Sequence, residues 1–120
     1  MLHIEIPGRA PMDIANVVFD YNGTIAVDGK MLPELRERIE ALLKLVPVYV
    51  LTADTYGTVR AQCEPLGMIV HTFPREGAAQ CKEEIVKALP GASACFGNGF
   101  NDIEMFDAAA LSVAILEGEG

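Results

Sequence analysis

Short apolar runs alternate along this chain with longer segments whose apolar side chains recur at helical spacing. The short runs are typical of strands that are buried on both faces of a parallel sheet. We expect such strands at residues 17–19, 48–51, 68–70, 93–96 and 111–116. Residues 3–6 alternate apolar and polar positions instead, which predicts a short separate strand that ends at Pro7 and Gly8.

The longer segments predict helices at residues 33–46, 55–66, 78–89 and 103–110. Pro33 suits the first turn of a helix, and Pro47 is a typical stop after the first of these segments. In the third helix we expect Cys81, Ile85 and Leu89 to face inward. Strands and helices therefore alternate along the chain.

This alternation predicts an α/β fold with a doubly wound, Rossmann-like, mostly parallel sheet and helices on both faces. Residues 24–31 predict a small hairpin flap around Asp28-Gly29 after strand one, since Asp-Gly favours a tight turn. The pattern shows no other insertion and no linker. We therefore expect a single domain over residues 1–120 that is capless, which means that no inserted cap domain covers its site. The chain ends soon after the last expected strand, which is compatible with a truncated C-terminus.

Composition and charge narrow the classes of partner. A net charge of -8 and a pI near 4.6 argue against nucleic-acid binding, which needs lysine and arginine to displace counterions. The sequence shows neither a signal peptide nor an apolar run long enough for a transmembrane helix, so we expect a cytoplasmic protein with no membrane partner. The spacing of Cys63, Cys81 and Cys95 suits neither zinc nor a disulfide framework, and we expect reduced, buried thiols.

Polar side chains gather where the expected strands end. In a doubly wound sheet the carboxyl ends of parallel strands share one edge, and ligands bind just beyond that edge. Asp20 follows the first buried strand, and Lys82 lies early in the helix before the fourth. The other polar residues at strand exits are Thr52, Asp54, Asn98, Asn101 and Asp102. A lone Asp at such a position is usually a turn or helix cap, and capping is the favoured role for Asp54.

This set of residue types indicates phosphoryl transfer. A carboxylate can attack phosphorus to form an aspartyl-phosphate, and a lysine beside it offsets the negative charge of the transferred group. Mg²⁺ prefers oxygen ligands, and its candidate ligands are Asp20, the backbone carbonyl of Asn22, Asn98 and Asp102. Candidate phosphate-binding groups are Thr52, the backbone N–H groups of Tyr21, Gly23, Thr24 and Ala53, and Asn101. For the Tyr21 ring two roles stay open: stacking on a substrate, or shielding the floor of the pocket.

Four segments resemble, in order, the motifs of haloacid-dehalogenase-like (HAD) phosphotransferases. Asp20-Tyr21-Asn22-Gly23-Thr24 resembles motif one, Thr52 motif two, Lys82 motif three, and Gly-Asn-Gly-Phe-Asn-Asp at 97–102 motif four. Motif four is similar to that of P-type ATPase phosphorylation domains, and the likeness is greatest to archaeal soluble P-type ATPase-like phosphatases.

The resemblance implies a HAD-type fold, an Mg²⁺ cofactor and a phosphorylated substrate. By the same resemblance Asp20 is the nucleophile, Thr52 a phosphate ligand and Lys82 the charge neutraliser, and Asn98 and Asp102 belong to the metal site. Relatives without a cap act on large substrates or use a neighbouring subunit to cover the site, so a homo-oligomer is one expected arrangement.

Two positions depart from the family's usual pattern. The second acid of motif one, which protonates the leaving group and then activates water, is Asn22 here. General acid–base catalysis is typically worth about 10²–10⁴-fold, so we expect low turnover and a persistent aspartyl-phosphate. Asn98 removes a further negative charge and should weaken the affinity for Mg²⁺ without abolishing coordination. The expected catalytic set is Asp20, Asn22, Thr52 and Lys82.

Two other functions stay open on the sequence. One is a catalytically weak phosphate-binding or regulatory module, in which Asn22 and Asn98 only cap turns. The other is a hydrolytic dehalogenase, because those relatives also lack the second acid of motif one. Lys82 and Asp102 favour phosphoryl transfer over dehalogenation.

Overall fold

The protein is described here by a computed structural model, which covers residues 2–21, 24–27, 30–31, 33–53, 58–74, 76–97 and 103–114. Its centre is a five-stranded sheet in the order β7-β6-β3-β8-β9, and every neighbouring pair is parallel. The strands are β3 (Asn16–Asp20), β6 (Val48–Thr52), β7 (Ile69–Thr72), β8 (Ser93–Gly97) and β9 (Leu111–Ala114). The predicted α/β, Rossmann-like fold is confirmed.

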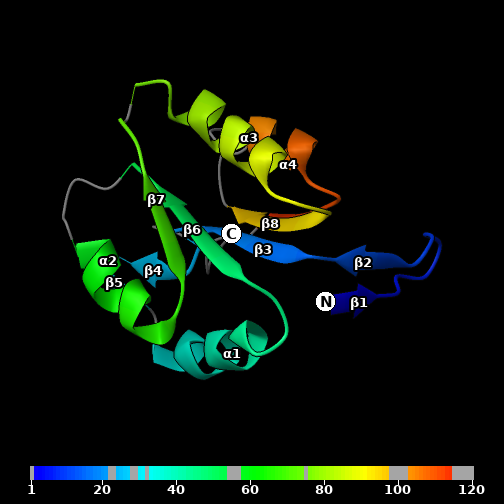
Figure 1. Ribbon diagram of the computed structural model, residues 1–120, viewed down its shortest axis with the longest axis horizontal. Coiled ribbons are helices and arrows are strands. Elements are labelled where there is room, and N and C mark those ends of the chain that lie inside the picture. Colours follow the sequence, from blue (N-terminus) through cyan, green and yellow to red (C-terminus); the bar gives the residue numbers. More distant parts are fainter. Residues whose placement is uncertain are drawn as a thin grey trace.

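Helices cover both faces of this sheet (Figure 1). The described helices are α1 (Pro33–Leu43), α2 (Thr58–Cys63), α3 (Ala78–Ala88) and α4 (Ile103–Ala108), and the 3-10 turn Glu64–Leu66 follows α2 directly. α1 and α2 pack on one face, and α3 and α4 pack together on the other. No helix in the described segments is long and apolar enough to cross a membrane.

The alternation of side chains along the strands divides the core between the two faces. In β3, Val17 packs with the cluster that includes Ile39 of α1, whereas Val18 packs with the cluster that includes Val86 of α3 and Met105 of α4. All five of these residues are buried. Each residue at the end of a strand is therefore directed to one face by its place in the alternation.

A first antiparallel hairpin precedes the sheet. β1 (Leu2–Ile4) pairs with β2 (Met12–Ile14), and β2 continues through Ala15 into the central strand. The sequence predicted β1 as a separate strand but missed β2. The reason is that β2 alternates over only three residues and adjoins the much stronger apolar signal of β3.

A second antiparallel hairpin follows β3, where a flap was expected. β4 (Ala26–Val27) pairs with β5 (Lys30–Met31). The Asp28-Gly29 turn itself lies outside the described residues. Within the described chain, strand β5 of this flap contacts helix α2.

Some element boundaries differ from the prediction because tertiary packing overrides the local pattern. α1 ends at Leu43, and the following residues form a turn in which the N–H groups of Leu45 and Val46 donate to the carbonyl of Leu42. β7 begins one residue later than expected and runs to Thr72, since pairing with β6 extends to that position.

The inward face of α3 agrees with the prediction in part. Ile85 and Leu89 are half-buried and pack against the core cluster that contains Val86, and Cys81 is half-buried. The buried residues of the helix are Lys82 and Val86. The helix packs against α4 as well as against the sheet, so the buried stripe is turned relative to the apolar pattern. This rotation places a lysine in the interior.

The amino ends of β3 and β8 are joined by neutral polar contacts. Asn16 Nδ2 donates to the carbonyl of Pro90 at 2.9 Å, and the hydroxyl of Ser93 donates to Asn16 Oδ1. The N–H of Ala15 donates to the carbonyl of Ala92 at 2.8 Å. Asn16 and Ser93 are both buried, so their mutual contact replaces the water that each has lost. We call Asn16, Pro90 and Ser93 the amino-end cluster.

Candidate active site

Asp20 stands at the carboxyl end of the central strand. It is the last residue of β3, and its Cα partner on the neighbouring strand β6 is Leu51. The alternation along β3 places Asp20 on the same face as Val18, which is the face covered by α3 and α4. Its side chain is only 15% exposed. A buried strand thus presents a carboxylate where little water reaches it.

The positive charge that meets Asp20 comes from α3. The helix begins after Gly77, whose φ of 77° lies in the left-handed region that favours glycine. Lys82 lies one turn before Val86 and shares its buried side of the helix. Lys82 Nζ donates to Asp20 Oδ1 at 3.0 Å, and the lysine side chain is 6% exposed.

The burial of this ion pair makes its two charges important for both stability and reactivity. Exposed ion pairs contribute little to stability, whereas removing one partner of a buried pair costs about 3–5 kcal/mol because the other charge is left alone. An ammonium group at hydrogen-bond distance favours the ionised form of a carboxylate. Asp20 is therefore held as a carboxylate beside a cation, which is the arrangement that attack on an anionic phosphoryl group requires.

Other predicted site residues lie at the same edge of the sheet. Thr52 ends β6, one position beyond the Cα partner of Asp20, and is 5% exposed. Ala53 follows it and is half-buried. Gly97 ends β8, one position beyond the Cα partner of Phe19. Neighbouring strands lie about 4.8 Å apart, so the fold brings the ends of β3, β6 and β8 together.

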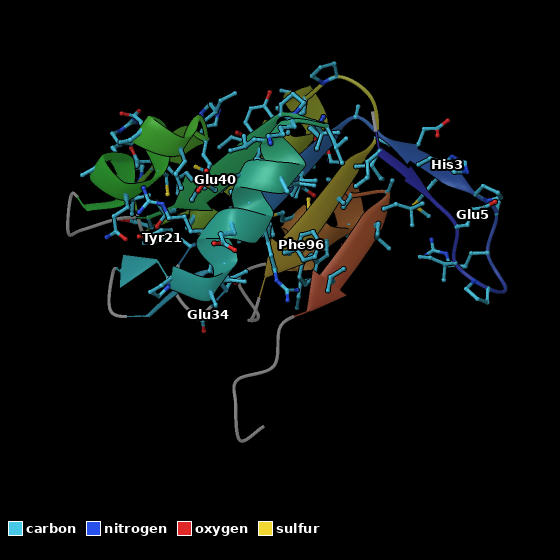
Figure 2. The ribbon with its side chains drawn as sticks, turned by 90° about the horizontal axis from the view of Figure 1, so that it is seen from below. His3, Glu5, Tyr21, Glu34, Glu40 and Phe96 are labelled. Atoms are coloured by element: carbon cyan, nitrogen blue, oxygen red, sulfur yellow. The ribbon has the colours of Figure 1, made fainter. Side chains whose placement is uncertain are left out.

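The chain leaves β3 in a tight turn that decides the role of the Tyr21 ring. The carbonyl of Tyr21 accepts hydrogen bonds from the N–H groups of Thr24 at 3.2 Å and Ile25 at 3.0 Å. The ring is fully buried in the cluster that contains Ile25 and Ile39, and Figure 2 shows it on the α1 side of the sheet. Of the two roles left open, this position fits shielding of the pocket floor and not stacking on a substrate.

Thr24 carries an unusual polar group. Its Oγ1 is buried and has no hydrogen-bond partner among the described residues, and the residue is 8% exposed. A buried hydroxyl without a partner costs about 1–3 kcal/mol. The group expected to bind phosphate here was the backbone N–H of Thr24, but that N–H donates to the carbonyl of Tyr21. The hydroxyl is therefore the group of Thr24 that a phosphate oxygen would contact.

The remaining predicted site residues, Asn22, Gly23, Asp54, Asn98, Asn101 and Asp102, lie outside the described residues. Asp20 is the described member of the predicted magnesium ligand set, and its carboxylate is the kind of oxygen donor that Mg²⁺ prefers. Within the described segments, no group of three or more His, Cys, Asp or Glu side chains could hold a metal ion. The magnesium site therefore stays a prediction from the sequence.

The three cysteines form no disulfide bond with one another, as the sequence predicted. Cys63 and Cys95 are buried, whereas Cys81 is half-buried and only partly fulfils the expectation of burial. Burial raises the pKa of Cys63 to about 12, and the negative charge of Glu64 adds to the rise. A thiol with such a pKa is neutral near pH 7, so Cys63 is unsuited to act as a nucleophile.

Sequence reasoning missed an aromatic pair that supports the site. Phe19 and Phe96 directly precede Asp20 and Gly97, and their ring centroids lie 5.0 Å apart at an interplanar angle of 30°. They join β3 to β8 on the face opposite Asp20, where Figure 2 shows Phe96. The sequence did carry a signal for this pair, because the apolar runs of β3 and β8 both place a phenylalanine directly before the last residue of the strand.

Comparisons with known proteins agree with this architecture. The family model of haloacid dehalogenase-like hydrolases matches residues 4–110, which is nearly the whole chain. An uncharacterized protein of Methanocaldococcus jannaschii is 44% identical over 39 residues, which are 32% of this chain and 89% of that protein. The extent of the family match, together with the parallel sheet that carries Asp20 at its carboxyl end, shows that the chain belongs to the haloacid dehalogenase-like hydrolases.

Proposed function

We propose that this chain is a magnesium-dependent phosphatase or phosphotransferase that works through an aspartyl-phosphate on Asp20. The observation that carries the proposal is the buried contact of Lys82 Nζ with Asp20 Oδ1 at 3.0 Å. Membership in a hydrolase family supports the reaction class. The likeness of residues 97–102 to the P-type ATPase motif supports phosphoryl transfer among the hydrolytic reactions, and with it the archaeal P-type ATPase-like subgroup.

In the first step, a carboxylate oxygen of Asp20 attacks the phosphorus atom and the bond to the leaving group breaks. Lys82 stabilises the phosphoryl oxygens, whose charge would otherwise repel the carboxylate. Thr52 and the Thr24 hydroxyl bind phosphoryl oxygens in this arrangement. Mg²⁺, held by Asp20 and by the predicted ligands Asn22, Asn98 and Asp102, would neutralise further negative charge on the transferred group.

Asn22 determines which leaving groups suit the site. Its amide is not an acid, so the departing oxygen must take its proton from water. Acyl and aryl phosphates, whose leaving groups are stable as anions, therefore suit this site better than alkyl phosphates. In the second step water attacks phosphorus, the bond to Asp20 breaks and inorganic phosphate leaves. This step is slow because position 22 offers no base to activate the water.

The proposal is tested by phosphate release from acetyl phosphate and from a series of aryl phosphates, with Mg²⁺ present. We expect Asp20→Asn to reduce the rate to the background of the buffer. In the wild type the rate should fall steeply as the leaving group becomes more basic. Equal turnover by the wild type and Asp20→Asn would rule out an aspartyl-phosphate on this residue.

Asn22→Asp is the complementary variant. Restoring the acid should raise turnover of poor leaving groups by about 10²-fold or more and leave good ones less affected. The plot of rate against leaving-group pKa should therefore become flatter. An unchanged slope would show that the missing acid at position 22 does not limit the reaction.

A phosphate-binding module is the second candidate, and Asn22 favours it. In that case beryllium fluoride binds together with Mg²⁺, no phosphate ester or acyl phosphate is hydrolysed, and Asn22→Asp stays inactive. Release of halide from 2-haloacids, with no release of phosphate, would instead identify a hydrolytic dehalogenase.

A further inference from the structure

Within the described part of the chain, the outer edge of β1 has no strand paired to it. β1 pairs with β2 in a register that sets His3 opposite Asp13, and these two strands form a separate two-stranded sheet in the described chain. The hairpin extends away from the amino end of the central sheet (Figure 1). The outer edge of β1 therefore offers backbone N–H and C=O groups to another strand.

The side chains along this edge alternate in character. Leu2, Ile4 and Ile6 are half-buried, and the first two pack against the core. His3 and Glu5 are exposed on the opposite side, and Figure 2 shows both on the projecting hairpin. β1 contains neither Pro nor Lys, the residues that commonly protect an exposed edge. An open edge with half-buried apolar residues is a surface that a further strand would cover.

We propose that two copies of this chain associate by antiparallel pairing of residues 2–6, which are β1 and the two residues after it, with the same residues of the second copy, centred on Ile4. In that register Ile4 of one copy faces Ile4 of the other, Leu2 faces Ile6, and His3 faces Glu5. The edge sequence Leu-His-Ile-Glu-Ile is complementary to its own reverse, because apolar residues meet apolar residues and the imidazole meets a carboxylate. A two-fold interface requires this kind of self-complementarity.

The charges of the hairpin support the same register. Within one chain, His3 Nδ1 lies 2.7 Å from Asp13 Oδ1, and its Nε2 lies 3.8 Å from Glu5 Oε1. Pairing of two copies adds the Glu5 carboxylate of the second copy on the open side of His3. The polar face of the joined sheet then carries an alternating row of acid, imidazole and acid.

Other registers lose this match. Centring the pair on His3 sets His3 against His3, and centring it on Glu5 sets two carboxylates against each other, which is destabilising. A shift by one residue in one copy sets apolar side chains beside charged ones and moves each apolar stripe to the wrong face. The Ile4-centred register is therefore the one that the side chains select.

This association leaves the candidate active site uncovered. The hairpin adjoins the amino end of β3, whereas Asp20 lies at its carboxyl end. Each copy thus keeps its own open site, and the proposal does not depend on the proposed phosphatase function. It also argues that the partner copy does not act as the missing cap.

The first test measures molecular mass by analytical ultracentrifugation across a range of protein concentrations. We expect a dimer, and we expect His3→Glu to raise its dissociation constant by about tenfold or more, because carboxylates then face each other. The double variant His3→Glu/Glu5→Lys restores opposite charges and should restore the dimer. Ile69→Glu changes an exposed residue of another edge strand, β7, and should leave the mass unchanged.

A second test reads the register directly by oxidative cross-linking. Directly opposed residues of paired strands have Cβ atoms about 5 Å apart, within reach of a disulfide. In a Cys81→Ser background, Ile4→Cys should form a covalent dimer under mild oxidation. Leu2→Cys should not, because the two Leu2 positions are four residues out of register, or about 13 Å apart.

Several results would overturn the proposal. A wild type that stays monomeric at the highest concentration excludes it. So does a dimer that Ile69→Glu dissociates and His3→Glu does not, or a double variant that fails to associate although circular dichroism shows it folded. Efficient cross-linking through Leu2→Cys with none through Ile4→Cys would exclude the Ile4-centred register.

Discussion

The two ends of the central sheet use polar residues in opposite ways. At the amino end, the amino-end cluster of Asn16, Pro90 and Ser93 is neutral and joined by hydrogen bonds, and Asn16 and Ser93 are buried. At the carboxyl end, Asp20 and Lys82 hold opposite charges largely out of water, and the buried hydroxyl of Thr24 has no partner among the described residues.

The difference indicates what each end contributes. Satisfied neutral contacts add to the free energy of unfolding. Buried charges, and a buried hydroxyl without a partner in the described structure, reduce it unless a ligand is bound. Local violations of the rules for stability are expected at functional sites and not elsewhere. This contrast supports the proposal that the carboxyl end serves binding and chemistry, whereas the amino end holds the strands in place.

The largest expected effect comes from removing the buried cation. Lys82→Met keeps the length of the side chain but leaves Asp20 without its ion-pair partner. We expect the free energy of unfolding, measured by urea denaturation at neutral pH, to fall by about 3–5 kcal/mol. Asp20→Asn/Lys82→Met removes both charges and should recover most of that loss. A single variant as stable as the wild type would show that the pair is not effectively buried.

The next effect tests how tightly the amino end is packed. Gly91 has a φ of 74°, and a Cβ added to it would lie 2.7 Å from the Cβ of Ala15. We expect Gly91→Ala to lower the free energy of unfolding by about 2–4 kcal/mol, from steric overlap and backbone strain together. Gly8→Ala is the matched control, since Gly8 has a φ of 85° but nothing within 4 Å of the added carbon. It should lose only the strain, about 1–2 kcal/mol, and equal losses would contradict close packing at Gly91.

A smaller effect is expected from the hydrogen bonds of the amino-end cluster. Asn16→Ala leaves the Ser93 hydroxyl and the Pro90 carbonyl without their partner, which should cost about 1–3 kcal/mol of unfolding free energy. Adding Ser93→Ala should then cost less than Ser93→Ala costs alone, because the two residues share one contact. Thermal unfolding of the four proteins gives the coupling, and strict additivity would argue against the cluster.

The smallest expected effect has the opposite sign. Thr24→Val removes a hydroxyl that has no partner among the residues the structure describes, and it keeps the branched shape. It should therefore stabilise the free protein by about 1 kcal/mol. The same change should weaken binding of phosphate or beryllium fluoride, measured by calorimetry, since the ligand loses a donor. Destabilisation by Thr24→Val would mean that the hydroxyl does contribute to the folded protein, and the contrast between the two ends would then be weaker.

The fold could be predicted from the sequence because burial on two faces leaves a strong local signal. Continuous apolar runs marked each strand of the central sheet, and Asp20 and Thr52 were placed correctly at strand ends. The strand β2 was missed because a stretch as short as Met12–Ile14 carries too few alternations to be distinguished from a loop. Helix α3 was predicted at the right place, and Ile85 and Leu89 do pack against the core. The burial of Lys82 was not predicted, since the packing of α3 against α4 is not encoded in its own apolar pattern.

The sequence by itself determined the alternation of strands and helices that forms the central sheet and its layers, the polar residues at strand exits and the motifs that resemble the HAD family. Only the tertiary structure decided that Lys82 reaches Asp20 across 62 positions of the chain, that Asn16 meets Ser93 across 77, and that the Tyr21 ring turns into the core. The physical reason is that periodicity reports only whether a position is buried. Which buried groups meet depends on the packing of helices against the complete sheet.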